Sequence, residues 1–380
     1  MAPEVAVYTT PPEALIGFLT TSHPLQALPL IRRLQFTRFP GGITEHARIL
    51  WCSRASLEHH SNTTTTANAA ADNGDGNGGD GARSPREEIP FAAAYLDLSR
   101  GPETELWIYS SMERRLGGGG GGGAGTGNGI RVEGEREGEG GKEDSTSGDH
   151  EKNEKQELEE EETACAVALL REVKREQDLY FAPGSARARE QRENAAILVG
   201  NLNEALRERL AAAGMAIAST GVYDKWVFKI DELPDVAAPR PLDDDDGGGR
   251  RWVWDVVRPA DIPFTIARTE IQRKERTLKL LPSTALYLDD GTLVAWAYLG
   301  PDSSLSSLHC EEPYRGRGLA KAVAVRILRD HIRDYGDGVY AWADVAPGNI
   351  QSQGVCRGLN GHVKWQISWS RLNLDQSFPE

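Results

Sequence analysis

The most informative stretch of this 380-residue sequence is SLHCEEPYRGRGLAKAVAVRILRD, which runs from Ser307 to Asp330. It reads as the end of a strand, a glycine-rich loop and then a helix. Gly316 and Gly318 let the backbone turn tightly and approach a ligand. The helix that follows offers unpaired N–H groups and a positive dipole end, and Arg315 and Arg317 add charge. The stretch therefore predicts a phosphate site, most simply one for a pyrophosphate.

Other readings of this loop are weaker. It is not a nucleotide-triphosphate loop, because no Gly-Lys-Ser/Thr follows, and it lacks the three glycines and the distant acid of the dinucleotide fingerprint. A turn that merely connects a strand to a helix remains the structural alternative. An RNA-binding RGG segment is disfavoured, because the single copy is followed by an apolar helical pattern.

The sequence around the loop alternates between strands and helices. Asp289-Asp290-Gly291 supplies the tight turn of a β-hairpin. From the apolar patterns we expect strands at Ala285–Leu288, Thr292–Leu299, Leu305–Cys310, Val339–Val345 and Val363–Ser370, and helices at about Ala260–Leu280, Leu319–Asp334 and Asn349–Leu359. This order predicts an α+β (mixed α/β) fold with a central parallel step.

The first two thirds of the chain show no motif of their own. Amphipathic helices are expected at Thr163–Glu176 and at Leu202–Ala213, the second capped by Asn201, and a strand at Lys225–Ile230. Two segments, at about 60–88 and 117–160, lack aromatic and large aliphatic residues, so we expect disordered inserts there.

Charge and composition exclude several classes of function. Residues 131–162 and Asp243–Asp246 carry thirteen of the fourteen net negative charges, so the rest of the chain is close to neutral. Binding to a nucleic acid requires a basic patch on the protein surface, so no nucleic-acid partner is expected. The longest apolar runs are too short for a membrane span, and the N-terminus does not resemble a secretory signal. The four scattered cysteines fit neither a zinc site nor a disulfide framework, so we expect an intracellular, cytoplasmic protein without a metal.

At the loop the chain resembles a known family. The spacing Arg315-x-x-Gly318-x-Ala320 is similar to the R/Q-x-x-G-x-G/A acyl-CoA loop of the GNAT superfamily of N-acyltransferases. Downstream, Asn349-x-x-Ser352 resembles the N-x-x-A/S helix start that follows the fifth strand of that family.

More narrowly, Gly291–Leu319 resembles the C-terminal domain of the glycine N-acyltransferase-like group, and the likeness covers about residues 250–370. It implies a C-terminal GNAT domain at 251–380, a linker at 241–250 and a degenerate GNAT-like lobe at 1–240. It also implies acetyl-CoA or another acyl-CoA as co-substrate, with a small-molecule amine or amino acid as acceptor. The oligomeric state stays open.

The resemblance also implies roles for residues. The residues expected to bind acyl-CoA are Leu308, Cys310, Arg315, Gly316, Arg317, Gly318, Leu319, Ala320, Asn349 and Ser352. A backbone N–H of the Leu308–Cys310 strand would polarise the thioester carbonyl, and the amine would attack directly.

The general base is ambiguous in the sequence. The candidates are His309, Glu311 and Asp302, with Asp344 a further one. Relatives carry a carboxylate near the position of Ser304, which this chain lacks. Cys356 stands where many members of the family place a tyrosine, and a ping-pong route through a cysteine is a remote alternative.

Three functions therefore stay open. The first is an acyl-CoA-dependent N-acyltransferase that acts on a small amine. The second is a non-catalytic CoA-binding or interaction protein, which the missing tyrosine and carboxylate motivate. The third is a protein or peptide N-acetyltransferase.

Overall fold

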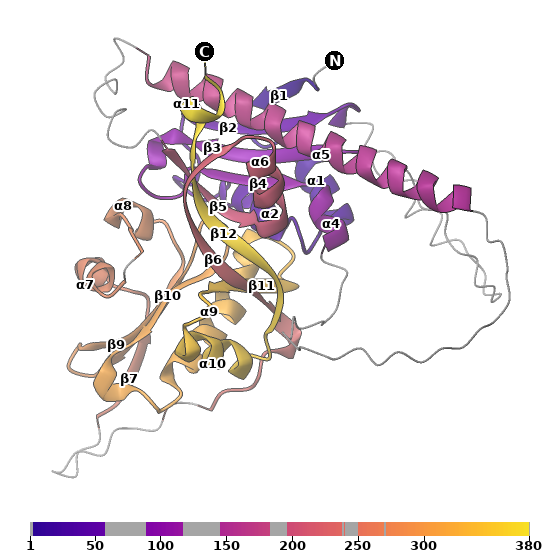
Figure 1. Cartoon of the computed structure of the whole chain (residues 1–380). Helices are drawn as coiled ribbons and strands as arrows, with labels where there is room; N and C mark the ends of the chain where they lie inside the picture. The colour runs from indigo at the N-terminus through magenta and orange to yellow at the C-terminus, as the bar shows by residue number, and fades with distance from the viewer. Residues whose placement is uncertain are drawn as a thin grey trace, which may run out of the picture.

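A computed structural model describes residues 3–57, 89–116, 145–182, 196–237, 239, 250–269 and 271–379 (Figure 1). In chain order the elements are β1 (Val5–Tyr8), α1 (Glu13–Ser22), α2 (Leu28–Phe36), β2 (Ala47–Ser53), β3 (Phe91–Asp97), β4 (Leu106–Ser110), α4 (Met112–Leu116), α5 (Ser145–Tyr180), β5 (Ala196–Asn203), α6 (Glu204–Ala212), β6 (Ala216–Lys229), β7 (Trp252–Asp255), α7 (Ile262–Ala267), α8 (Glu275–Leu278), β8 (Ser283–Leu288), β9 (Leu293–Leu299), β10 (Leu305–Cys310), α9 (Leu319–Tyr335), β11 (Tyr340–Val345), α10 (Ile350–Gly358), β12 (His362–Asn373) and α11 (Leu374–Ser377).

These strands form two sheets. The larger has the order β1-β2-β3-β4-β5-β12-β6-β11, and the smaller has the order β10-β9-β8-β7. Nearly all neighbouring strands are antiparallel, but β4 and β5 pair in parallel. Helices cover the sheets on both sides (Figure 1). The predicted α+β class is confirmed.

The last strand of the chain completes the sheet of the first half. β12 lies between β5 and β6, where Ile367 faces Asn203 on one side and Tyr223 on the other. β6 in turn pairs with β11, from Tyr340 opposite Lys229 to Val345 opposite Asp224. Figure 1 shows β6 and β12 as two long, twisted strands that run from one half of the molecule into the other. The two halves therefore share one continuous sheet.

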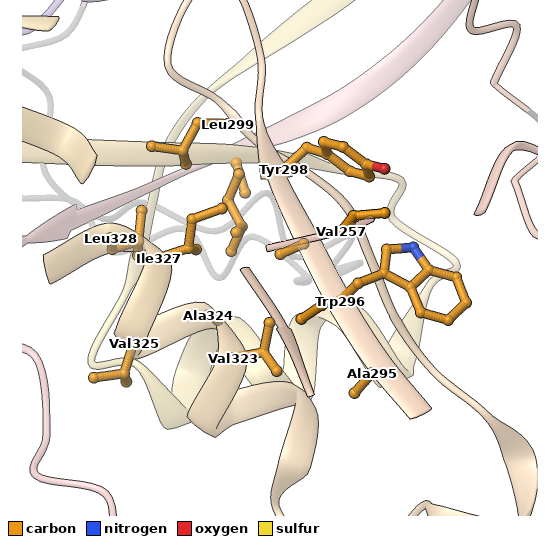
Figure 2. Close-up of a cluster of buried hydrophobic side chains, with 14 of the residues drawn as sticks. Val257, Ala295, Trp296, Tyr298, Leu299, Val323, Ala324, Val325, Ile327 and Leu328 are labelled. Atoms are coloured by element: carbon orange, nitrogen blue, oxygen red, sulfur yellow. The ribbon is translucent and has the colours of Figure 1, made fainter. Parts of the chain in front are cut away.

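Helix α9 packs on the smaller sheet through small residues. Ala295 and Ala297 of β9 are fully buried and alternate with Trp296 and Tyr298. Figure 2 shows α9 on one side of β9 and the side chains of Trp296 and Tyr298 on the other. Because alanines face the helix, its first turn can lie close to the end of β10.

Helix α5 is longer than the sequence predicted. The expected helix at Thr163–Glu176 extends over Ser145–Tyr180, into part of a segment expected to be disordered. Glu, Lys and Gln are good helix formers, and the apolar second half anchors the helix. The amide of Gln156 donates to Glu160 one turn on, at 2.9 Å. Residues 58–88 and 117–144 lie outside the described part of the chain.

The sequence analysis was wrong about the cap at Asn201 and missed strand β5. The cap of α6 is Asn203, whose side chain accepts from the N–H of Ala205 at 3.0 Å. Asn201 belongs to β5 with φ of 59°. The sequence pattern hid this strand because Gly200 interrupts it. Gly200 is needed there, since a Cβ would lie 2.7 Å from Thr104 and 2.9 Å from the ring of Trp369.

The helix expected at about Ala260–Leu280 is broken. Only α7 and the one-turn α8 are helical, and the segment between them is held to β10 by side chains. Arg268 binds Glu311, and Arg273 donates to Ser306 at 2.9 Å. Among the described residues, no helix is long and apolar enough to cross a membrane.

A buried ion pair lies where β6 meets β11. Lys225 and Asp344 face each other across the two strands, with Nζ 2.6 Å from Oδ1. Lys225 is 1 % exposed and its Nζ lies 3.4 Å from the ring centroid of Trp342. Burial lowers the pKa of Lys225 and raises that of Asp344. Each charge therefore needs the other.

Replacing one partner of this pair should be far more damaging than replacing both. We expect Asp344→Leu to lower the free energy of unfolding by about 3–5 kcal/mol, because it leaves the Lys225 charge buried without its carboxylate. The double variant Lys225→Met/Asp344→Leu should recover most of that loss in a denaturant titration. A single variant as stable as the wild-type protein would contradict this account.

Candidate functional site

A groove lies beside β10, between the first turn of α9 and helix α10. β10 is the edge of the smaller sheet and β11 the edge of the larger, so these neighbouring strands have no hydrogen-bonded register. The groove holds about 650 Å³, and its walls are Leu308, His309, Cys310, Arg315, Gly316, Gly318, Leu319, Ala320, Lys321, Asn349, Gln351, Ser352, Gly354, Val355 and Gly358. The structure thus brings nine of the ten expected acyl-CoA residues together, and Arg317 is exposed outside these walls.

The glycine-rich corner is open. Gly316 and Gly318 have φ of 77° and 76°, and a Cβ built on either one meets nothing within 4 Å. Glycine is needed here for the left-handed backbone rather than for space. Gly318 is the N-cap of α9, and Leu319 is 2 % exposed and anchors the first turn in the core. The free N–H groups of this turn therefore face an accessible space.

Two basic side chains flank this corner. Arg315 turns back toward β10, where its Nε donates to the carbonyl of Cys310 at 3.0 Å. Lys321 lies in the first turn of α9 and lines the groove beside Gly358. The sequence analysis missed Lys321, although a lysine just inside a helix that begins with a glycine loop is a usable signal for anion binding.

A bulge interrupts β10 beside the groove. The register with β9 shifts between Ser306 and His309, and Ser307 has φ of 51°. A bulge leaves strand backbone groups unpaired and re-aims them. Since β10 is also an edge strand, its outer side can offer backbone groups to a ligand, although the carbonyl of Cys310 already accepts from Arg315. No residue type in the sequence marked this bulge.

The far wall of the groove is the start of α10. The side chain of Asn349 caps this helix by accepting from the N–H of Ser352 at 3.0 Å. The pair proposed from its spacing is therefore a helix cap that shapes the groove.

His309 lies on the face of the sheet opposite α9. It is paired with Trp296 across β10 and β9, and the two rings stack with centroids 4.6 Å apart. Burial lowers its pKa, and the Glu311 carboxylate opposes that shift. The ring is therefore neutral near pH 7, as a general base must be.

Glu311 orients the imidazole. Its Oε1 lies 3.1 Å from Nε2 of His309, and a carboxylate can only accept, so Nε2 carries the hydrogen and Nδ1 keeps its lone pair. Arg268 binds the same carboxylate at 2.8 Å and, with His309, holds the pKa of Glu311 low. The result is an Arg–Glu–His relay at the mouth of the groove.

Asp302 lies away from this relay. It is buried in the turn before β10, where it accepts from Trp107 Nε1 at 3.0 Å and from the hydroxyl of Ser304 at 2.7 Å. Asp344 is engaged with Lys225. Both carboxylates are held by neighbouring groups, whereas Nδ1 of His309 has no such partner among the described contacts.

The cysteines are poor nucleophiles. Burial raises the pKa of Cys310 to about 11 and that of Cys356 to about 12, so both stay protonated near pH 7. Cys356 is 3 % exposed and packs in the core, which fits a small core residue in the tyrosine position. Among the described residues, no group of three His, Cys, Asp or Glu side chains could hold a metal ion.

The first half of the chain has a different corner after β4. There Glu162 of α5 is fully buried, and it binds Arg115 and the hydroxyl of Ser111 at 2.8 Å. These contacts join α5 to the segment that follows β4.

Two family models match the sequence of this chain. Residues 2–227 match the family model of the acyl-CoA N-acyltransferase verG N-terminal domain, and residues 285–370 match that of FR47-like protein. A search of curated proteins found no match.

Three solved structures are similar to this chain to different extents. A Drosophila protein is 12 % identical over 95 % of both chains, with a TM-score of 0.52. A tandem GNAT protein from the clavulanic acid biosynthesis pathway is 9 % identical over 97 % of both chains, with a TM-score of 0.44. A GCN5-related N-acetyltransferase from Kribbella flavida is 17 % identical, with a TM-score of 0.32, over 49 % of this chain and 70 % of that one.

The Arg–Glu–His relay predicts the titration of His309. Glu311→Gln removes a negative charge that stabilises the imidazolium, while the Arg268 charge remains, so the pKa of His309 should fall further below its ordinary value. NMR of the imidazole signals across pH measures this directly. Arg258→Gln, which removes an exposed charge elsewhere, is the control. A His309 pKa that rises or stays unchanged in Glu311→Gln would refute the relay.

Proposed function

This chain belongs to the family of the acyl-CoA N-acyltransferase verG N-terminal domain, and from that premise we propose that it transfers an acyl group, most simply acetyl, from a CoA thioester to a primary amine of a small molecule or amino acid. Its domains are GNAT domains, and GNAT acyltransferases use acyl-CoA. The proposed catalytic domain is 251–380, with 1–240 as the second lobe and 241–250 as the linker.

The single observation that carries the proposal is the open glycine corner at the end of a strand that has no partner on its groove side. In this proposal the N–H groups at Gly316–Ala320 hold the pyrophosphate, and Lys321 adds a positive charge. The pantetheine arm then lies along Leu308–Cys310 and pairs with the free backbone edge like an added strand.

The bulge supplies the next step. An N–H in the bulge of β10 donates to the thioester oxygen and stabilises the negative charge that develops as the amine adds to the carbonyl carbon. Nδ1 of His309 takes the proton that the amine loses. The carbon–sulfur bond then breaks, and the CoA thiolate leaves and is protonated. Both reactants are held together, so no covalent enzyme intermediate is needed.

Thiol release tests the activity. The full-length chain is incubated with acetyl-, benzoyl- and longer acyl-CoA and a panel of amines and peptides, and free thiol and acylated products are measured. Turnover of a small amine supports the proposal, while acylation of peptides alone would point to a peptide N-acetyltransferase. CoA binding without turnover of any pair would favour the non-catalytic alternative, which the core position of Cys356 motivates.

The phosphate corner has a matched control within the same chain. Gly318→Asp places a negative charge where the pyrophosphate is proposed to bind, so CoA binding measured by calorimetry should be lost. Gly214→Asp introduces the same charge at φ of 89°, also with nothing within 4 Å of its Cβ, but after α6 and outside the groove. It should bind CoA like the wild-type protein, and equal affinity in the two variants would refute the assignment.

His309 should matter for turnover more than for binding. His309→Asn keeps a polar side chain without a titrating base, and we expect kcat to fall roughly 10²- to 10⁴-fold with little change in CoA affinity. In the wild-type enzyme, kcat/KM should rise with pH through an acid limb set by the lowered pKa of His309. Full activity of His309→Asn would assign the base elsewhere.

A further inference from the structure

A second, smaller pocket lies between the two lobes and is not part of the groove. It encloses about 30 Å³, and its walls are Arg33, Phe36, Arg100, Glu103, Thr104, Trp107, Arg273, Thr277, Leu280, Pro301, Asp302, Ser304 and Trp369. A water-sized group needs about 10–15 Å³ of such space. The pocket therefore takes two or three non-hydrogen atoms, which is the size of a carboxylate.

Arg33 brings a buried charge to this pocket from α2. It is 1 % exposed, and its guanidinium lies 3.6 Å from the ring centroid of Tyr95. One terminal nitrogen donates to the carbonyl of Gly42 at 3.2 Å, but Nε and Nη1 have no hydrogen-bond partner among the described residues. Burial lowers its pKa, yet an arginine stays charged. A buried cation with two nitrogen atoms that make no hydrogen bond destabilises the folded state unless an anion binds to it.

Arg273 brings a second charge from the other lobe. It lies between α7 and α8 and donates through Nη2 to Ser306, one residue before the bulge of β10. Its Nε is buried and also lacks a partner among the described residues. The two arginines thus border one pocket from opposite lobes, and each offers unused N–H groups.

The acids in the pocket form no ion pair with these arginines in the described part of the chain, although the charges of Asp302 and Glu103 partly offset the burial that lowers the pKa of Arg273. Glu103 accepts from the N–H of Lys274 at 3.0 Å and from the hydroxyl of Thr277 at 2.6 Å, and Asp302 is held by Trp107 and Ser304. Neither carboxylate lies within ion-pair distance of either arginine in the described part of the chain.

The remaining cation of the pocket is already paired. Arg100 binds Asp97 at 3.2 Å. Arg33 and Arg273 are therefore the two charges in this pocket that an anion could satisfy.

We propose that this pocket is an anion subsite that binds a carboxylate through Arg33 and Arg273. It borders Ser304 at the start of β10, whereas the groove begins at Leu308, so the subsite and the groove lie on opposite sides of the bulge. At about 3.3 Å per residue these two positions are roughly 13 Å apart. The carboxylate can come from the acceptor amine itself, which rests on the proposed function, or from a free small acid.

Acetate binding tests the subsite without any need for turnover. Acetate is titrated into the CoA-free protein at constant ionic strength by calorimetry, and we expect saturable binding. Arg273→Gln should weaken it about ten- to a hundred-fold, because a charge-assisted hydrogen bond is lost. Arg33→Gln should act in the same way if it folds. Arg276→Gln removes a nearby exposed charge that does not line the pocket and should bind acetate like the wild-type protein.

Acyl transfer then distinguishes the two sources. If the acceptor supplies the carboxylate, Arg273→Gln should raise KM for a long ω-amino acid such as 8-aminooctanoate, whose amine and carboxylate can span this distance, but not for its amide. If a free acid binds, acetate should bind while amino acids and amides respond alike to the substitution. No saturable acetate binding by the wild-type protein, or equal binding by Arg273→Gln, overturns the subsite. Since that first measurement does not involve acyl-CoA, failure of the proposed function leaves it intact.

Discussion

The position of the last strand, β12, in the larger sheet sets the geometry around the groove. β12 lies between β5 and β6, and β6 then binds β11, so the larger sheet holds β11 through a continuous ladder of backbone hydrogen bonds. β10 stays with β9 in the smaller sheet. β10 and β11 are thus fixed to different sheets and do not pair with each other. A ligand need not force the strands apart, because no pairing between them has to be broken.

This pairing of β12 with strands from the first half of the chain also explains which parts of the fold the sequence could predict. The hairpin, β10, α9 and α10 were predicted within a few residues, because each is specified by a local signal such as the Asp-Gly turn or the glycines before α9. β5 was missed because its determinants are distant. A glycine is required at position 200 because the ring of Trp369, in the last strand of the chain, leaves no room for a Cβ. A single sequence shows a glycine there but not the ring that requires it.

The candidate site also has parts that the sequence could predict and parts that it could not. The glycine corner was predictable, since positive φ values and the free N–H groups of a helix start are properties of a short segment. Three other features could not be predicted, because each joins segments that only folding brings together. These are the bulge at Ser307, the ion pair of Arg268 with Glu311 and the stacking of His309 on Trp296. The orientation of the His309 ring follows from the Glu311 carboxylate beside it.

Buried polar and charged contacts hold the first half of the chain against the second. Lys225 from β6 meets Asp344 from β11, and Trp107 from β4 donates to Asp302 before β10. Each of these contacts joins the first half of the chain to the strands that flank the groove. Isolated buried charges are unfavourable, so an arrangement in which each lobe supplies the partner for the other favours one relative position of the two.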